Sequence, residues 1–596
     1  MEYTSITIKK RIALFKRLYG GQKYQILFLT ILGFINGIVA SIGAGALIPL
    51  FSFVVHAGNP SEDRVSRYII SAFHYFNFEP NALRLLILVC ALFVLKAILT
   101  IIFGYISLKI SLDYSIMLQQ NLYRGVLHTN WSYLSQQKIG FIENTLMVDT
   151  SYAKNMIKRM STIIYQCTSF LMYFIVAFTI SRFITLATMG MGLFILLMLI
   201  PLMRKTKIYS QATLGLRKEI AHRVNENVVG VKTIKVTGVE DQVNQSVIKF
   251  FEKMKKMMMR SYVVRNMPED ALETISLLFV SVVFGLSYTR PGFDFAAFLV
   301  VVYLIQKIFA YVTQTHGIIH DINDATPYLE RVLNLSEEIS RFQEKEEGHK
   351  PFRFSHALEL HDVKFAYGEA DSVINGISFT LQKGEMIGII GPSGAGKTTI
   401  VDILLRLFTP DQGVILVDGT DIRMIDLQEW RKHIGYVSQD IFLRNDTIRS
   451  NIAFYNDAVT EKDIIAAAKT AYCYDFIMNL PDKFNTMVGE RGLRLSGGER
   501  QRIVLARVLA QKPSILILDE ATSALDNESE MAIRSAIKNI RGELTLIVIA
   551  HRLSTVTDAD TLLVLENGSI IERGKPKDLL EDETSYFHRA YTTGLL

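Results

Sequence analysis

Long apolar runs dominate the first half of the chain, and they restrict its fold more than any other feature. They lie near residues 24–55, 83–108, 161–180, 183–203, 268–288 and 294–318. A helix needs about 20 apolar residues to cross the hydrocarbon core of a bilayer. The sequence therefore predicts six membrane-spanning helices in a domain covering 24–320. The composition agrees, because 49% of the 596 residues are hydrophobic and only 20% are charged.

The distribution of lysine and arginine predicts how these helices are oriented. Cations are frequent in the N-terminal arm and in segment 204–265, whereas the loops 56–82 and 289–293 carry few. Because cytoplasmic loops hold the excess of positive charge, we expect the N-terminus and the long loops 109–160 and 204–267 to be cytoplasmic. This predicts a multi-pass protein of the inner (plasma) membrane. Both long loops show helical periodicity, so we expect the membrane helices to continue into the cytoplasm.

The N-terminal arm and the overall charge add two further expectations. Residues 1–23 alternate apolar and basic side chains at helical spacing, which is typical of an interfacial amphipathic elbow helix. The net charge of +6 is mild and no long basic tract is present, so a nucleic-acid partner is not expected.

The second half of the chain has a different pattern. Segment 321–353 is charged and helix-like, and it reads as a connector. From residue 354 to 596, short apolar strands such as "MIGIIG" and "SILILDE" alternate with amphipathic helices. This alternation predicts an α/β domain with a mainly parallel sheet. The expected fold class is thus an all-α six-helix membrane domain followed by an α/β P-loop nucleotide-binding domain.

A glycine-rich loop, "GPSGAGKTT", follows the strand "MIGII" and precedes an apolar helix. It fits the pattern G-x-x-x-x-G-K-[ST], whose backbone N–H groups cradle phosphates. We expect Lys397 to reach the β- and γ-phosphates of ATP, and the Thr398 hydroxyl to bind Mg²⁺. The loop residues expected to contact the nucleotide beside these two are Gly391, Ser393, Gly394, Ala395, Gly396 and Thr399.

Two further apolar strands deliver polar side chains to what should be the same sheet edge. "SILILDEAT" ends in Asp519 and Glu520, and ligands of α/β proteins bind at the carboxyl ends of the strands. We expect Asp519 to hold Mg²⁺, directly or through water, and Glu520 to polarise an attacking water. "LTLIVIAHRLST" brings His551 to that edge, where it would contact the γ-phosphate.

The order of these motifs resembles that of ATP-binding cassette (ABC) transporters. The likeness also covers Tyr367 in "FAYG", Gln439 in "YVSQD", "VGERG", "LSGGERQ" and "SALD", which ends at Asp526. With the six apolar runs ahead of it, the chain resembles an exporter half-transporter. The resemblance implies an ATPase that uses ATP and Mg²⁺. It implies that Tyr367 stacks on adenine, that Gln439 binds Mg²⁺, and that Asp526 lies at the nucleotide.

The resemblance also implies a partner, namely a second copy of the same chain. In this family the "LSGGERQ" loop, here Ser496, Gly497 and Gly498, closes over a nucleotide held by the other copy. The segments "WSYLSQQKIGFIENTL" and "NVVGVKTIKVTGVEDQ" resemble the coupling segments of such transporters. They also fit ordinary helical connectors.

Three ionisable residues interrupt the apolar runs: Lys96, Glu273 and Lys307. A charge at the bilayer centre costs about 2.5–3.5 kcal/mol on insertion scales, so each should face a cavity or a partner. One reading is a structural Lys–Glu pair. The other is a site for an anionic amphiphile, such as a lipid-linked oligosaccharide or another phosphorylated lipid. The latter resembles the branch of exporters that flips lipid-linked oligosaccharides or lipid A.

Other functions were weighed against ATP-driven export. A soluble ABC ATPase that acts on nucleic acid or ribosomes conflicts with six apolar runs. A multidrug or peptide exporter and an ATP-gated channel remain open, because they share the nucleotide motifs. An importer is less expected, since importers of this family usually carry the membrane and ATPase parts on separate chains.

Overall fold

The computed structural model describes residues 20–55, 64–288, 295–345, 348–368, 372–520, 527–550 and 552–593. The expected elbow helix lies outside the described residues up to residue 19. The chain divides into two compact units. The first comprises residues 1–129 and 137–342, and the second comprises residues 130–136 and 343–596.

The first unit is entirely helical in its described part. After the short 3-10 turn η1 (Gly20–Gln22), its elements are α2 (Lys23–Gly45), α3 (Leu47–Val55), α4 (Arg64–Tyr75), α5 (Ala82–Leu127), α7 (Ile139–Asn144), the π-helical turn η2 (Thr145–Asp149), α8 (Thr150–Ile180), α9 (Arg182–Val229), α10 (Val231–Thr237), α11 (Glu240–Tyr288) and α12 (Phe295–Arg341).

All six predicted apolar runs are helical in the described residues. Four helical stretches are long and apolar enough to cross a membrane: Gly20–Phe53, Ala82–Leu127, Gly140–Ile180 and Ala297–Arg341. Two shorter apolar stretches, Arg182–Ile195 and Thr274–Tyr288, lie in α9 and α11, at the fourth and fifth predicted runs. Bilayer hydrocarbon offers no hydrogen-bond partners to the backbone, and a helix satisfies these groups internally.

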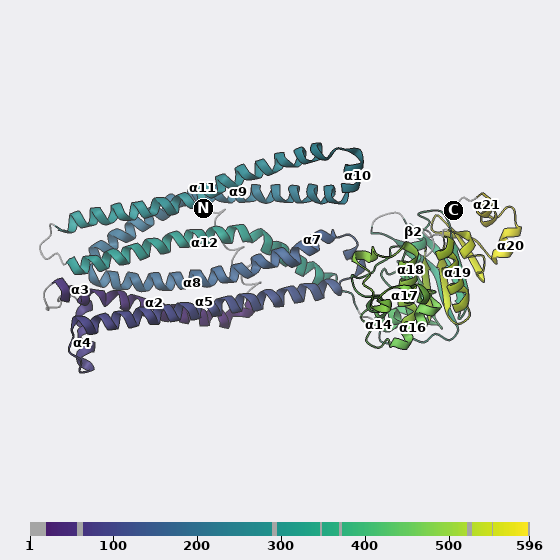
Figure 1. Ribbon diagram of the computed structural model, residues 1–596, viewed down its shortest axis with the longest axis horizontal. Helices are drawn as coiled ribbons and strands as arrows, with labels where there is room; N and C mark the ends of the chain where they lie inside the picture. Colours follow the sequence, from purple (N-terminus) through teal and green to yellow (C-terminus); the bar gives the residue numbers. More distant parts are fainter. Residues whose placement is uncertain are drawn as a thin grey trace. The chain divides into compact units, whose positions relative to one another are not determined.

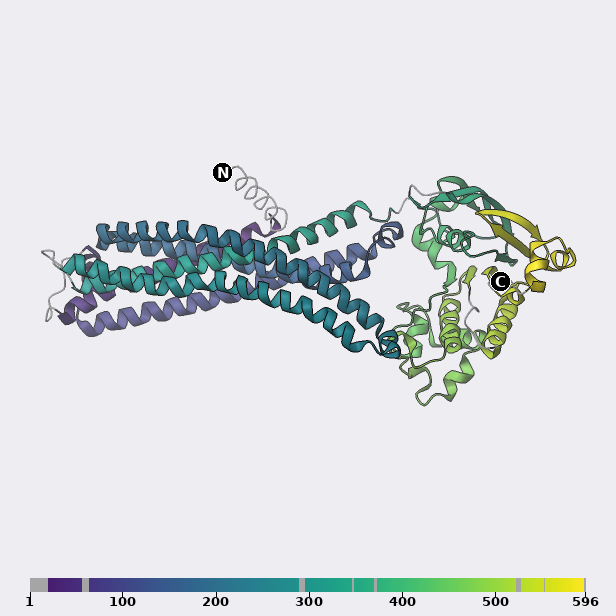
Figure 2. The ribbon, with the colours of Figure 1, turned by 90° about the horizontal axis from the view of Figure 1, so that it is seen from above.

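Within the first unit, α8 packs against α2, α5 and α12, and α9 packs against α11. Figures 1 and 2 show these long helices running side by side. Small residues bring α2 close to α8: a Cβ atom at Gly37 would lie 3.3 Å from the Cα atom of Ser169. Such close backbone approach is typical of helix pairs in membranes, where packing rather than water exclusion drives association.

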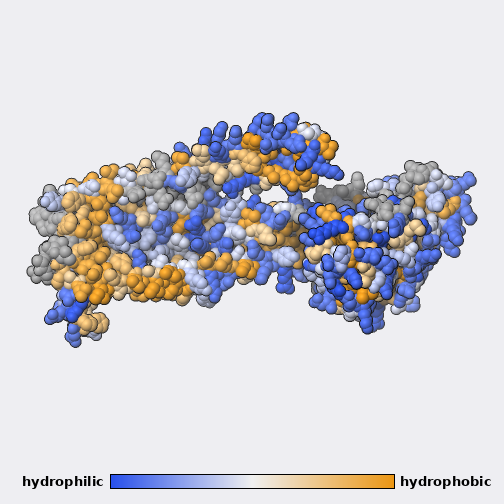
Figure 3. All heavy atoms as spheres, viewed as in Figure 1, coloured by the Kyte–Doolittle hydropathy of each residue, from blue (hydrophilic) through white to orange (hydrophobic). Residues whose placement is uncertain are grey.

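The long helices continue well beyond the apolar runs, as the periodicity of the loops predicted. Figure 3 shows hydrophilic side chains gathered where α9 and α11 reach α10, and hydrophobic side chains toward the opposite ends of the helices. A tight reversal joins α8, which ends at Ile180, to α9, which begins at Arg182. There, the Ser181 hydroxyl accepts a hydrogen bond from the backbone N–H of Ile184 at 3.5 Å and begins α9.

The second unit contains two sheets. One has the order β2-β1-β4-β5, and the other has the order β10-β9-β3-β8-β7-β6. In the larger sheet, neighbouring strands are parallel except for the antiparallel pair β9 and β10. The strands are β1 (Ala357–Ala366), β2 (Ser372–Gln382), β3 (Met386–Ile390), β4 (Gln412–Val417), β5 (Thr420–Asp421), β6 (Ile434–Val437), β7 (Ile515–Asp519), β8 (Thr545–Ile549), β9 (Thr561–Glu566) and β10 (Ser569–Gly574).

Helices surround these sheets. They are α6 (Trp131–Leu134), α13 (Lys397–Leu404), α14 (Leu427–Lys432), α15 (Ile448–Ala453), α16 (Glu461–Thr470), α17 (Tyr474–Asn479), α18 (Gly497–Ala510), α19 (Asn527–Ile540), α20 (Pro576–Glu581) and α21 (Tyr586–Thr593), with short 3-10 turns between them. The central strands β3, β7 and β8 are buried at every position. This explains why they read as unbroken apolar runs, since both faces of a parallel sheet are covered.

Candidate functional site

The glycine-rich loop joins β3 to α13, as predicted. Gly391 has a φ of 149°, and a Cβ atom there would lie 2.1 Å from the carbonyl oxygen of Leu565. Gly396 has a φ of 98°, and its Cβ atom would lie 2.7 Å from Ile374. A larger residue is therefore excluded at both positions, and the loop can wrap closely around a phosphate only because they are glycines.

Lys397 is the first residue of α13 and is buried. Its ammonium group donates hydrogen bonds to the carbonyl oxygens of Gly391, at 2.7 Å, and Pro392, at 3.0 Å. Burial lowers the pKa of Lys397, and the negative charges of Glu520 and Asp519 oppose this shift. The loop thus holds one buried cation beside the helix N-terminus, which suits it to bind an anion such as a phosphate.

Asp519 ends β7 and is 2% exposed. Its buried Oδ1 atom has no hydrogen-bond partner among the residues that the structure describes. Burial, together with the negative charge of Glu520, raises the pKa of Asp519 to about 6. A buried carboxylate oxygen beside the Thr398 hydroxyl fits a hard cation such as Mg²⁺, which prefers oxygen ligands and keeps several waters.

Glu520 follows Asp519 and has a φ of 49°, in the left-handed region that few residues other than glycine adopt. Its backbone N–H donates to the carbonyl oxygen of Ile549, at 3.0 Å, which holds this turn against β8. The amide of Gln439 donates a hydrogen bond to Glu520 Oε2 at 2.5 Å. The turn therefore aims the Glu520 carboxylate away from the strand and toward Gln439.

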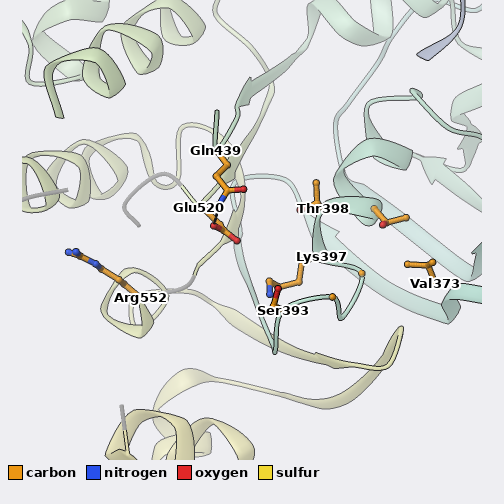
Figure 4. Close-up of a pocket in the computed structure, with 10 residues that line it drawn as sticks. Val373, Ser393, Lys397, Thr398, Gln439, Glu520 and Arg552 are labelled. Carbon is orange, nitrogen blue, oxygen red and sulfur yellow. Dashed lines mark hydrogen bonds between the residues drawn. The ribbon is translucent and has the colours of Figure 1, made fainter. Parts of the chain in front are cut away.

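Of these residues, Lys397, Thr398, Gln439 and Glu520 line one cavity of about 750 Å³, and Asp519 is not among its lining residues. Figure 4 shows Gln439 and Glu520 side by side, with Lys397 and Thr398 across from them. The lining residues are Val373, Ser393, Gly394, Gly396, Lys397, Thr398, Thr399, Gln439, Glu520 and Arg552. The sequence reasoning did not select Val373 or Arg552. Arg552 follows His551 in "AHR", and its guanidinium is ion-paired with Glu530. The sequence signal for Arg552 was its position directly after His551, which was predicted to contact the γ-phosphate.

Tyr367 lies next to the cavity. Its hydroxyl is 3.0 Å from the Thr399 hydroxyl, and its ring contacts Phe365 and Phe408 edge to face. The side chain is 41% exposed. A ring that is fixed on its edge and open to solvent is able to stack on a base, so adenine stacking stays a prediction for this residue.

The "LSGGERQ" segment, which we call the signature loop, forms the beginning of α18. The Ser496 hydroxyl accepts a hydrogen bond from Glu499 N–H at 3.3 Å, and the Glu499 carboxylate accepts one from Ser496 N–H at 2.8 Å. Gly497 and Gly498 are the first two residues of the helix. Among the described residues, the cavity around Lys397 is not lined by any of these three. The chain does not bring its two phosphate-binding loops together.

Some predicted site residues lie outside the described residues. These are Asp526, His551 and the side chain of Glu273. Alanine 395 is buried within the glycine-rich loop.

The two lysines in the membrane-spanning helices are neighbours. Lys96 lies on α5 and Lys307 on α12, and their ammonium groups are close enough to repel each other. Lys96 donates to the Tyr173 hydroxyl at 3.4 Å, and Lys307 lies 5.5 Å from the ring centroid of Tyr303. Within the described part of the chain, neither lysine has a carboxylate partner.

Comparison with known proteins identifies both units. Residues 26–314 match the ABC transporter transmembrane region, and residues 374–523 match the ABC transporter family. An ATP-dependent lipid A-core flippase from Francisella tularensis is 30% identical over 492 residues, which are 80% of this chain and 79% of the relative. The chain belongs to the ABC transporter family. Its second unit is the ATPase domain of that family, and its first unit is the transmembrane region.

Two further proteins are similar to this ABC transporter. An ATP-dependent lipid A-core flippase from Saccharophagus degradans is 38% identical over 396 residues, and the match spans 64% of each chain. The structure of a bacterial Atm1-family ABC exporter with ATP bound has a TM-score of 0.72 and 23% identity, and the match covers 98% of this chain and 99% of that one. This neighbour shows the fold and confirms the predicted fold class.

Proposed function

We propose that the protein is an ATP-driven exporter or flippase that works as a homodimer and moves an anionic amphiphile across the membrane. ATP would be bound in the cavity around Lys397 and hydrolysed there. The observation that carries the proposal is the ATPase cavity, in a chain whose other unit has helices long enough to span a bilayer.

The residues of the cavity can share the work of phosphoryl transfer. Lys397 and the loop N–H groups would hold the β- and γ-phosphates, and Glu520 would orient the attacking water. Thr398, Asp519 and Gln439 are placed to hold Mg²⁺, which when bound neutralises charge on the phosphate oxygens. Positioning and electrostatic stabilisation supply most of the catalysis in reactions of this kind.

The separation of the two phosphate-binding loops supports the homodimer. Lys397 lines the cavity, whereas the N–H groups at the beginning of α18 do not reach it. Two copies related by a two-fold axis would each place the beginning of α18 over the other copy's cavity. ATP would then bind between the copies and hold them together, and hydrolysis would release them.

Mixing two inactive variants tests this arrangement. Lys397→Ala destroys one half-site, and Ser496→Arg destroys the other. A mixed dimer keeps one complete site, so an equal mixture should recover about a quarter of the wild-type ATPase rate. Each variant alone should be inactive. If the mixture is as inactive as its components, the two loops do not act across a dimer.

The lysine pair in the first unit supports an anionic cargo. Two neighbouring ammonium groups, those of Lys96 and Lys307, place positive charge inside apolar helices. Such charge is costly in a bilayer unless an anion accompanies it. The relatives named as lipid A-core flippases agree with a phosphorylated lipid.

A substrate panel tests the cargo. The full chain in proteoliposomes should show ATPase stimulation by lipid A or a lipid-linked oligosaccharide, and neither cationic drugs nor neutral lipids should match it. Stimulation by cationic drugs alone would favour a multidrug exporter. Passive ion conductance in a planar bilayer on adding ATP would favour a channel.

The proposed orientation places the N-terminus and the ATPase domain in the cytoplasm, with the protein in the inner (plasma) membrane. The cationic segments of the sequence support this topology. Labelling of single cysteines at Tyr68 and at Val236 by a membrane-impermeant reagent, applied to intact cells, would test it. Only the first position should react.

A further inference from the structure

The residues that follow α12 are fastened to one place in the ATPase domain. The connector strap, described at residues 343–345 and 348–352, lies along residues 423–433. The N–H groups of His349 and Lys350 donate to the Met424 carbonyl at 3.1 and 2.9 Å, and Asp426 N–H donates to the Lys350 carbonyl at 2.9 Å. A Cβ atom at Gly348 would lie 2.2 Å from the Ile425 carbonyl oxygen. Only glycine permits this approach.

A charged fork adds a second attachment. The guanidinium of Arg431 donates to both carboxylate oxygens of Glu344, at 2.7 and 3.0 Å. Both side chains are about a third exposed or less, at 33% and 27%. Bidentate arginine–carboxylate pairs are among the stronger and more directional hydrogen-bonded contacts in proteins.

The same guanidinium holds the far end of the helix that begins at the nucleotide loop. Arg431 donates to the carbonyl oxygens of Leu405, at 3.2 Å, and Arg406, at 3.0 Å. The indole of Trp430 donates to the carbonyl oxygen of Leu404 at 2.8 Å. These carbonyl groups lie at the C-terminal end of α13, where the helix dipole favours a cation. The N-terminal end of α13 carries Lys397 and Thr398.

The residues after Arg431 lead to Gln439, which contacts the carboxylate of Glu520. His433 precedes β6. Its ring stacks on that of Phe352 in the strap, with the ring centroids 4.4 Å apart. Two residues after β6 comes Gln439, whose amide donates to Glu520. The strap is therefore attached where α13 ends and where the segment carrying Gln439 begins.

We propose that Glu344 and Arg431 are positioning residues that transmit displacement of α12, through the connector strap, to the nucleotide site. The inference rests on the proposed function, because it assumes that α12 moves during transport. It gives the transporter a route between its units along the covalent chain. Glu344 is the anchor on the strap, and Arg431 joins that anchor to α13. Neither residue lines the nucleotide cavity.

The experiment compares Glu344→Ala, Glu344→Gln and the control Glu429→Gln in the full-length protein in proteoliposomes. Glu429 lies on the same helix as Arg431, and its carboxylate forms an exposed pair with Lys432, at 3.9 Å. Glu344→Ala should keep basal ATPase within about twofold of the wild type. Its stimulation by lipid A should fall about fivefold, the scale of a coupling free energy between sites. Glu344→Gln, which retains an acceptor, should lie between, and the control should match the wild type.

A second measurement does not depend on the cargo. Hydrogen exchange of peptides covering residues 336–352 should respond to ATP with vanadate in the wild type and the control. In Glu344→Ala this response should be lost, while the glycine-rich loop is still protected. An unchanged response in Glu344→Ala would overturn the proposal. Equal losses of basal ATPase, ATP binding and loop protection would also overturn it, by making the pair purely structural. If lipid A fails to stimulate the wild type, the proposed cargo is wrong, and hydrogen exchange still decides the role of the strap.

Discussion

The Gln439 amide donates a 2.5 Å hydrogen bond to the Glu520 carboxylate. Gln439 lies just after β6 and Glu520 just after β7, and these two strands are parallel neighbours. This hydrogen bond fixes the direction of the carboxylate. It also links two segments that sequence analysis had assigned to Mg²⁺ binding and to water activation. Glu520, which is proposed to orient the attacking water, thus lies on the same cavity as the glycine-rich loop.

Replacing Glu520 by glutamine should separate ATP binding from turnover. The substitution keeps the shape of the side chain but removes the carboxylate that would orient water. Steady-state ATPase activity should fall about 100-fold or more, whereas binding of a fluorescent ATP analogue should persist. Asp440→Asn is the control, because Asp440 is exposed beside Gln439 and does not line the cavity. Near-normal turnover in Glu520→Gln would remove Glu520 from this role.

The raised pKa of Asp519 predicts that the stability of the nucleotide-free protein depends on pH. Burial and the charge of Glu520 raise its pKa from 3.8 to about 6. The folded protein holds the proton more tightly than the unfolded chain does. The carboxyl therefore stabilises the fold below about pH 4, and this contribution is lost as the pH rises through about 6.

Asp519→Asn tests that sign. The variant should gain thermal stability relative to the wild type at pH 8, by up to about 3 kcal/mol, and gain less at pH 5. Stabilisation by ATP with Mg²⁺ should be much weaker in the variant, because the negative charge that would hold the cation is gone. Differential scanning fluorimetry of the full chain at both pH values measures these effects. A gain that is equal at both pH values would contradict the assigned pKa.

Two matched helix caps distinguish the structural and functional roles of Ser496. Ser496 caps α18 and Thr460 caps α16, and each hydroxyl accepts from a backbone N–H at 3.3 Å in a reciprocal capping box. Either alanine variant should lose about 1 kcal/mol of stability. Only Ser496→Ala should also lower ATPase activity, by about tenfold, because its hydroxyl is proposed to contact the other copy's nucleotide. Equal ATPase losses in both variants would leave Ser496 with a structural role alone.

Lys96 and Lys307 should matter for the cargo more than for hydrolysis. Lys96→Ala or Lys307→Ala should lower lipid A flipping about tenfold, the scale of a lost hydrogen bond to a charged group. Basal ATPase should stay close to that of the wild type. Lys109→Ala is the control, because Lys109 is exposed on the same helix as Lys96. Normal flipping by both variants would exclude the anionic-lipid site.

The sequence by itself determined the parts of this protein that depend on neighbouring residues. Apolar runs of membrane length became helices because the backbone must satisfy its own hydrogen bonds in lipid. The glycines of the loop 391–399 allow the predicted tight loop because only glycine adopts the required φ without strain. The run "ILILD" became a buried strand that ends with Asp519 at the sheet edge.

Only the tertiary structure decided which distant segments meet. The fork between Glu344 and Arg431 joins residues 87 positions apart, and neither residue belongs to a motif. Lys96 and Lys307 became neighbours because α5 and α12 pack in the same bundle. Arg552 reached the cavity through the turn after β8, and the signature loop remained outside it. Such contacts follow from the packing of whole elements, which depends on many side chains at once, so no local pattern of residues encodes them.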